Sequence, residues 1–216
     1  MPKVCIDAGH GTPNDPGAVN GKRREMDDTM RLTQLLDKLF RAQGWDTVLP
    51  RVDDNAPKLA VLTSMANSNK CDLYLSIHRN AFSNSAANGV EIWLHSQAPQ
   101  RYKDWAADIL KAFGDIGYYN RGVKLGHASG AGEYAINRDT VMPSMLLEVG
   151  FITSDGDNSL FDGKLDETAN AVVRACCTFV GVAYKDVAPP SLPDKTYTLD
   201  IAKLREQGFG KIEIKL

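Results

Sequence analysis

The stretch from Asp72 to Ala81, which reads DLYLSIHRNA, constrains the fold more than any other part of this chain. Residues 73–77 are almost continuously apolar, and this run is far too short to cross a membrane. Such a run is typical of a parallel strand that is buried on both faces of a sheet. We therefore expect an α/β fold, in which ligands bind beyond the carboxyl ends of the strands. His78 lies at that end of the expected strand.

Two further residues that can bind a metal or move a proton occupy the same place on other expected strands. His10 follows the strand expected at residues 3–7, and Glu148 ends an apolar run that begins at Ser144. The carboxyl ends of parallel strands share one edge of a sheet. We therefore expect His10, His78 and Glu148 to meet in one crevice.

The rest of the pattern alternates strands with helices, which predicts an α/β domain with a mostly parallel twisted sheet flanked by helices. The expected strands cover residues 3–7, 45–49, 73–77, 89–95 and 144–149, with a short extended piece at 134–137. The expected helices cover residues 25–43, 55–69, 100–113 and 167–183, and each has apolar residues at helical spacing. In the second helix, the residues expected to face inward are Leu59, Leu62, Met65 and Ala66. Segments 8–21 and 114–132 are rich in glycine, so we expect them to be irregular.

The domain organisation follows from a proline-rich break near the C-terminus. We expect a main domain over residues 1–184, a semi-rigid linker over 185–195 and a short tail over 196–216. The tail pattern predicts a short helix at 201–207 and a strand at 211–216, which cannot bury a core alone. The tail is therefore expected to dock on the domain, to pair with a second copy in a homodimer, or to stay loose.

Composition excludes several classes of partner. A net charge of −2 gives no electrostatic case for binding nucleic acid or an anionic membrane. No segment approaches the roughly 20 apolar residues of a membrane helix, so we expect no membrane insertion. The 4 cysteines form no Cys-x-x-Cys pair and are expected to be buried reduced thiols. The first expected strand begins without an apolar leader, so we expect synthesis in the cytoplasm without a signal peptide.

A metal site is one interpretation of the histidines at the strand ends. Catalytic zinc takes three protein ligands, often two histidines and one carboxylate, and keeps one position open. His10 and His78 supply the imidazoles, and Glu25 begins the first expected helix after a loop long enough to fold back. Spacing alone leaves plain structural alternatives open: a turn cap, a satisfied histidine, and a favourable charge at a helix N-terminus.

Glu148 has two interpretations from its position alone. A carboxyl group at the end of an apolar strand is desolvated, and desolvation raises its pKa. A raised pKa beside a metal-activated water is usual for a general base. The alternative is a buried ion pair with Arg138 or Lys124. Burial does not decide between these two roles.

Five stretches resemble, in order, the zinc-dependent N-acetylmuramoyl-L-alanine amidases of the amidase 3 family. They are DAGHG (7–11) with DPGA (15–18), the helix-opening Glu25, AN (66–67) with CDLYLSIHRNA (71–81), GVE (89–91), and Pro143 through LEVGF (147–151). The resemblance covers about residues 3–183. It implies one Zn²⁺ per chain held by His10, Glu25 and His78, with Glu148 as the catalytic base.

The resemblance also implies a function, namely hydrolysis of the amide between the lactyl group of N-acetylmuramic acid and L-alanine in peptidoglycan. A zinc peptidase that cuts the stem peptide is an alternative, and so is a wall-binding protein that has kept the fold. The expected role is that of a phage or prophage endolysin, which acts on the wall after release. A bacterial autolysin that lyses the mother cell is the alternative, and the tail is then a wall-binding or dimerising element.

Other polar residues are candidates for supporting roles. Asn80, Arg138 and Asn137 are candidate substrate contacts, although the family usually has an apolar residue at position 137, and Asn80 is equally consistent with capping a strand end. Glu91 either bonds to a zinc-ligating histidine or faces solvent. His127 either touches substrate or lies at the surface.

Overall fold

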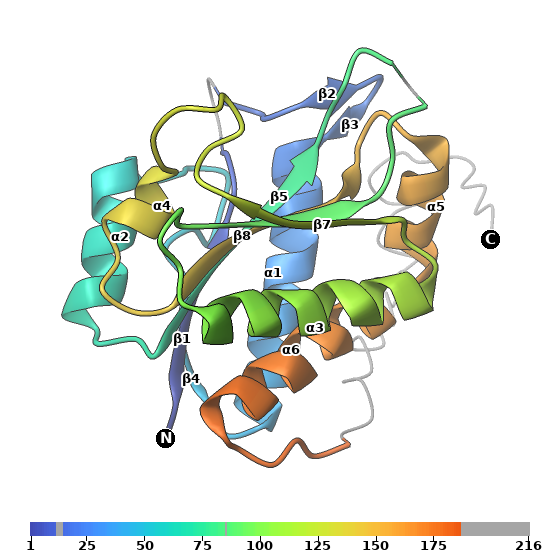
Figure 1. Ribbon diagram of the computed structural model, residues 1–216. Coiled ribbons are helices and arrows are strands. Elements are labelled where there is room, and N and C mark those ends of the chain that lie inside the picture. The colour runs from blue at the N-terminus through green and yellow to red at the C-terminus, as the bar shows by residue number, and fades with distance from the viewer. Residues whose placement is uncertain (12–14, 85, 187–216) are drawn as a thin grey trace, which may run out of the picture.

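The computed structural model describes residues 1–11, 15–84 and 86–186, which form a six-stranded sheet between helices (Figure 1). The strands of this sheet are β1 (Lys3–Ala8), β4 (Asp46–Val48), β5 (Leu73–Asn80), β6 (Val90–Leu94), β7 (Asn120–Leu125) and β8 (Ser144–Phe151). A separate hairpin consists of β2 (Val19–Asn20) and β3 (Arg23–Arg24). The helices are α1 (Glu25–Ala42), α2 (Leu59–Ser68), α3 (Gln100–Ile116), α4 (Ala135–Arg138), α5 (Asp155–Gly163) and α6 (Leu165–Val180). The tail and the linker from residue 187 onward lie outside the described residues.

The strand order is β4-β1-β5-β8-β6-β7, and the expected α/β fold with a mostly parallel sheet is confirmed. Every pairing in this sheet is parallel except that of β6 with β8. The carboxyl ends of β1, β5 and β8 therefore reach the same edge as the amino end of β6. Among the described residues, no helix combines the length and the apolar character that a membrane span requires.

The two faces of the sheet are covered unequally. The main core lies between one face and helices α1, α3 and α6 (Figure 1). The other face carries α2 and α4 over a small cluster that consists of Cys5, Ala66, Cys71, Tyr74, Ile136 and Leu146. Strand alternation places Asp7, Ser76, His78 and Glu148 on this second face, nearer the carboxyl edge. Because α2 and α4 cover only part of the face, these polar side chains border an open cavity.

The expected second helix starts later than the pattern indicates. It begins at Leu59 and not at residue 55, because proline disfavours helical backbone in the residue before it and Pro57 lies in that segment. Lys58 is also extended, with ψ of 148°. Leu59, which was expected to face the core, is 59% exposed, whereas Leu62 and Ala66 are buried as expected.

Other expectations about local structure are wrong. Of residues 134–137 only Tyr134 is extended, since Ala135–Arg138 form α4. This single turn is too short to show a helical period. The buried side chain of Asn137 holds it in place by donating to the Trp93 carbonyl of β6. The glycine-rich segment 114–132 contains β7, a half-buried edge strand in which Gly122, at φ of 87°, lies where the pairing with β6 shifts register. Helix α5 and the β2–β3 hairpin were not predicted.

Candidate metal centre and active site

His10 leaves β1 in a left-handed conformation, with φ of 64°. Its Nδ1 lies 2.8 Å from Asp15 Oδ1, and its Nε2 lies 3.2 Å from Glu25 Oε2. The Asp15 carboxylate therefore orients the ring so that Nε2 faces Glu25, an arrangement common behind metal-ligating histidines. Gly17 allows the loop to approach, because a Cβ there would lie 2.6 Å from Glu25 Oε2.

Glu25 is the first residue of α1 and is only 3% exposed. Its Oε2 accepts a hydrogen bond from the Ala18 amide at 2.8 Å. Its Oε1 accepts one from the Arg79 amide at 2.9 Å and lies 3.0 Å from His78 Nδ1. One carboxylate thus joins the loop after β1 to the last residues of β5.

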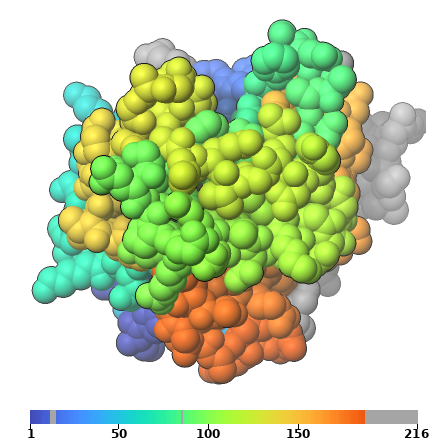
Figure 2. Space-filling view, viewed as in Figure 1, coloured from blue at the N-terminus to red at the C-terminus, as the bar shows by residue number. Residues whose placement is uncertain are grey.

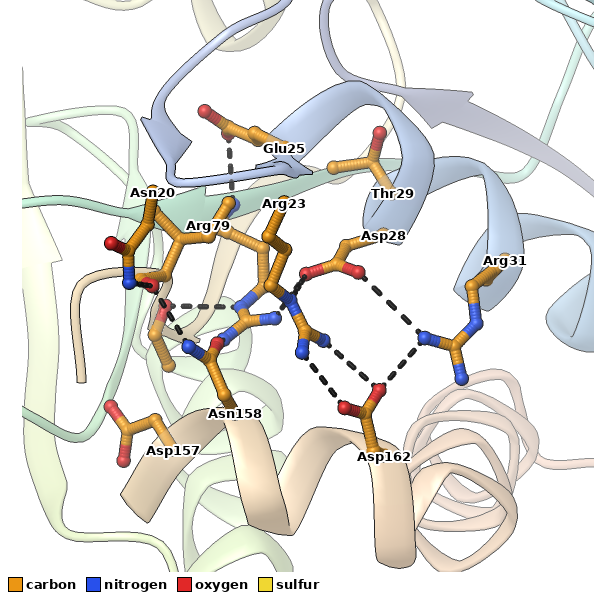
Figure 3. Close-up of polar contacts among 12 residues, drawn as sticks. Asn20, Arg23, Glu25, Asp28, Thr29, Arg31, Arg79, Asp157, Asn158 and Asp162 are labelled. Atoms are coloured by element: carbon orange, nitrogen blue, oxygen red, sulfur yellow. Dashed lines mark hydrogen bonds and ion pairs between the residues drawn. The ribbon is translucent and has the colours of Figure 1, made fainter. Parts of the chain in front are cut away.

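The Arg79 side chain anchors the same region on the side away from the cavity. Its guanidinium is buried, pairs with Asp28 of α1, and donates to Asn158 Oδ1 of α5 at 2.7 Å. Figure 3 shows that this network continues through further charged residues, namely Arg23, Arg31 and Asp162. The start of α1, which carries Glu25, is therefore fixed against β5 and α5.

The three residues proposed as ligands come together in the structure. One ligand atom from each of His10, Glu25 and His78 lies within 4.8 Å of the others. Two imidazoles and one carboxylate are a donor set that catalytic zinc uses while keeping one position open. The number, type and spacing of these groups therefore fit Zn²⁺.

Protonation of this cluster competes with metal binding. Burial opposes the charged form of His10, but its contacts with Glu25 and Asp15 outweigh burial and raise its pKa to about 9. His78 behaves in the same way, and its contact with Glu25 raises its pKa despite burial. Burial would raise the pKa of Glu25, but the two histidines hold it well below its usual range. Because metal ligands must be deprotonated, metal affinity is expected to rise with pH.

Glu148 lies on β8, opposite His78 on β5 and opposite Glu91 on β6. The residue borders the cavity, and its Oε2 is buried with no hydrogen-bond partner among the described residues. Burial raises the pKa of Glu148 to about 7, His78 opposes this shift, and the Glu91 carboxylate adds to it. An unpartnered buried carboxyl oxygen calls for an explanation, and a role in proton transfer supplies one.

Two residues proposed for substrate contacts are not brought to the cavity. Arg138 is exposed and pairs with Asp139 at 2.7 Å. Asn137 is buried and donates to a backbone carbonyl of β6. Neither Arg138 nor Lys124 forms an ion pair with Glu148 in the part of the chain that the structure describes.

Glu91 matches neither of its two expected roles. It is 5% exposed, so it does not face solvent, and it forms no hydrogen bond with His10 or His78 among the described residues. Its Oε1 accepts from Asn80 Nδ2 at 3.0 Å, and its Oε2 lies 2.8 Å from Arg121 Nε. Asn80 borders the cavity, and this contact makes it a support for Glu91.

A cavity of about 750 Å³ lies over these groups. Its apolar wall comes from the start of α2, from α4 and from β8, and consists of Ala56, Pro57, Leu59, Leu62, Ile136 and Leu146. His127 also lines the cavity, and its ring centre lies 4.2 Å from that of Tyr134. Figure 2 shows the segment after β7, in yellow, at the surface on the same side of the molecule as α2, in cyan. His127 is therefore part of the cavity wall.

Sequence analysis missed two residues that support the site. Asp15 opens the DPGA motif, but the sequence alone does not indicate its contact with His10. Arg79 is a charged residue inside the otherwise apolar stretch that organises the fold. A buried charge needs a partner, so Arg79 carried a signal that could have been used.

Comparisons with known proteins show the family of this chain. The family described as N-acetylmuramoyl-L-alanine amidase (Amidase_3) matches residues 4–177. The probable cell wall amidase LytH of Staphylococcus aureus is 30% identical over 166 residues, which cover 75% of this chain and 52% of LytH. The chain thus spans about half the length of the curated relatives that it matches.

Solved structures are similar over most of the chain. The catalytic domain of the amidase CwlV from Bacillus (Paenibacillus) polymyxa var. colistinus superposes with a TM-score of 0.74 at 28% identity, and covers 85% of this chain and 100% of its own. An N-acetylmuramoyl-L-alanine amidase from Clostridium difficile 630 also gives a TM-score of 0.74, at 26% identity, with coverage of 83% and 97%.

Proposed function

Since this chain belongs to the amidase 3 family of N-acetylmuramoyl-L-alanine amidases, we propose that it is a zinc-dependent peptidoglycan hydrolase. The bond to be cleaved is the amide between the lactyl group of N-acetylmuramic acid and L-alanine of the stem peptide. The observation that carries the proposal is the convergence of His10, Glu25 and His78 beside the unpartnered carboxyl group of Glu148.

In this proposal each residue of the site has a defined task. His10, Glu25 and His78 would hold one Zn²⁺ per chain. Zinc in such a site acts as a Lewis acid on a carbonyl oxygen and makes water a stronger nucleophile at neutral pH. Glu148 takes the proton from the attacking water and hands it to the departing alanine amine. In the metal-free protein burial raises the pKa of Glu148, which favours a carboxyl group that can both accept and release a proton.

Two variants test the assignment. Glu148→Ala should keep its fold and its zinc but lose activity by about a hundredfold or more, which is the scale for removing a general base. His78→Ala should lose the metal, which elemental analysis of the purified protein measures. Full activity of Glu148→Ala on purified wall would refute the role of Glu148.

The reaction products distinguish the amidase from a zinc peptidase. Mass spectrometry of digested wall should show free muramoyl lactyl groups and new N-terminal alanine. Cleavage within the stem peptide would instead indicate the peptidase. A protein that binds wall but releases neither product would indicate a binding protein that has kept the fold.

The biological role that we propose is that of a phage or prophage endolysin, with a mother-cell autolysin as the alternative. Protein produced in the host cytoplasm should then act on the wall only after a membrane-permeabilising agent is added. Lysis that follows sporulation, and that is lost when the gene is deleted, would instead indicate the autolysin.

We also propose that residues 196–216 bind the wall or pair two chains. Removal of residues 187–216 should reduce sedimentation with purified wall or change the mass in solution. If neither changes, the tail has no such role.

A further inference from the structure

Arg51, in the loop after β4, is a buried cation that has no counterion among the described residues. Its side chain is 1% exposed, and none of the described carboxylates lies within ion-pair distance of it. A buried charge without a partner is costly, and it persists only where other contacts compensate. The hydrogen bonds of Arg51 are therefore the contacts that offset the cost of burying its charge.

Those hydrogen bonds go to the backbone beside two proposed metal ligands. Arg51 Nε donates to the Ala8 carbonyl at 2.9 Å, and Nη2 donates to the Met26 carbonyl at 2.8 Å and to the Gly9 carbonyl at 3.3 Å. Ala8 and Gly9 directly precede His10, whereas Met26 directly follows Glu25. One guanidinium thus links the two backbone segments that carry these ligands.

Thr29 of α1 completes the arrangement. Its hydroxyl is buried, donates to the Gly9 carbonyl at 2.8 Å and lies 3.0 Å from Arg51 Nη2. Figure 3 shows Thr29 on α1 close to Glu25. The carbonyl of Gly9 therefore has two donors, directly before the left-handed His10. A residue other than glycine rarely adopts this conformation, which persists only where the surroundings hold it.

We propose that Arg51 and Thr29 are positioning residues, which hold His10 and Glu25 in the arrangement that binds Zn²⁺. The inference rests on the proposed zinc site. The positive charge of Arg51 does not favour metal binding, because the guanidinium and a nearby Zn²⁺ carry charges of the same sign and repel each other. The planar fork of the guanidinium reaches acceptors on β1 and α1 at once, which a lysine ammonium cannot reproduce.

A matched pair of isosteric variants tests the proposal. Thr33 lies one turn after Thr29 on α1 and is equally buried, but its hydroxyl has no hydrogen-bond partner among the described residues. Thr29→Val should weaken zinc affinity about tenfold, the lower end of the range for supporting partners of metal ligands. Thr33→Val should leave zinc affinity unchanged, and Thr29→Ser, which keeps the hydroxyl, should restore it. A competing chelator measures each affinity.

A spectroscopic readout separates positioning from stability. In protein loaded with Co²⁺, Thr29→Val should change the visible absorption bands that report ligand geometry, whereas Thr33→Val should not. Arg51→Lys should weaken zinc binding by about 10- to 100-fold although it keeps the charge. If Arg51→Lys does not fold, the comparison of Thr29→Val with Thr33→Val still tests the positioning role.

Three results have distinct meanings. Unchanged zinc affinity and Co²⁺ bands in Thr29→Val, even with a lower Tm, would overturn the positioning role. A wild-type protein that binds zinc but cleaves no wall amide would overturn the proposed function and leave the positioning role standing. A wild-type protein that binds no zinc would overturn both.

Discussion

A row of three side chains crosses neighbouring strands at the cavity: His78 on β5, Glu148 on β8 and Glu91 on β6. Two carboxyl groups directly opposite each other disfavour simultaneous ionisation. Arg121 pairs with Glu91 at 2.8 Å, whereas Glu148 Oε2 has no partner among the described residues and burial raises the pKa of Glu148 to about 7. The ion pair of Glu91 and the unpartnered oxygen of Glu148 suit Glu148 for proton exchange.

Removing the charge of Glu91 and removing the charge of Arg121 should shift the pH dependence of kcat/KM in opposite directions. A general base must be deprotonated, so kcat/KM should rise as pH passes through the pKa of Glu148. Glu91→Gln removes a negative charge that raises this pKa and should shift the rise to lower pH. Arg121→Gln removes the counterion of Glu91 and should shift the rise in kcat/KM to higher pH. Rate profiles from pH 5 to 9 measure both, and a shift of both variants in the same direction would contradict this account.

The raised pKa of Glu148 also has a consequence for stability. Its folded value of about 7 exceeds the usual 4.5, so the metal-free fold loses stability as pH rises from 4.5 to 7. Glu148→Gln removes this cost. It should stabilise the metal-free protein by up to about 3 kcal/mol at pH 8 and leave its stability near pH 4 unchanged. Urea unfolding at the two pH values measures the difference, and an equal effect at both would argue against it.

At the scale of elements, the sequence predicts the long helices and strands, whose apolar residues repeat many times, but it does not predict the short elements. Helix α1 and strands β1, β5 and β8 carry long apolar periods, and they lie within a few residues of their expected bounds. The single turn α4 and edge strand β7 depend on tertiary contacts, which leave no period in the sequence. The same limit applies to the site, because Arg51 and Asp15 act on groups that only the folded chain brings near.

Helix α5, which sequence analysis did not predict, depends on one buried carboxylate. Asp157 Oδ2 accepts from the Gly89 amide at 2.8 Å and from the Phe151 amide at 2.7 Å. Asp157→Ala leaves both buried amides unpaired and should destabilise the protein by about 2–4 kcal/mol. The exposed Asp155 in the same helical turn is the control, and Asp155→Ala should cost less than about 1 kcal/mol. Chemical denaturation measures both, and equal effects would rule out the role of Asp157.

At the scale of the whole molecule, zinc should act as a fold-stabilising ligand. Free zinc at about a thousand times its Kd contributes roughly 4 kcal/mol, which should raise Tm by about 10 °C. His10 has a pKa of about 9 before it binds metal, so protons compete and the rise in Tm should be smaller at pH 6 than at pH 8. His78→Ala should show little rise at either pH. A rise in His78→Ala equal to that of the wild type would place the metal elsewhere.

The reversed direction of β6 also determines where this protein can accept new sequence. Strand β5 ends where Asn80 and Ala81 line the cavity, and β6 begins at the same edge of the sheet because it runs antiparallel to β8. A peptide grafted into the connection between Asn80 and Val90 would leave the strands that carry His78 and Glu148 unbroken, and it would start beside the cavity. A graft that carries a protease cleavage sequence at this point is the design to test for a latent form that a protease activates.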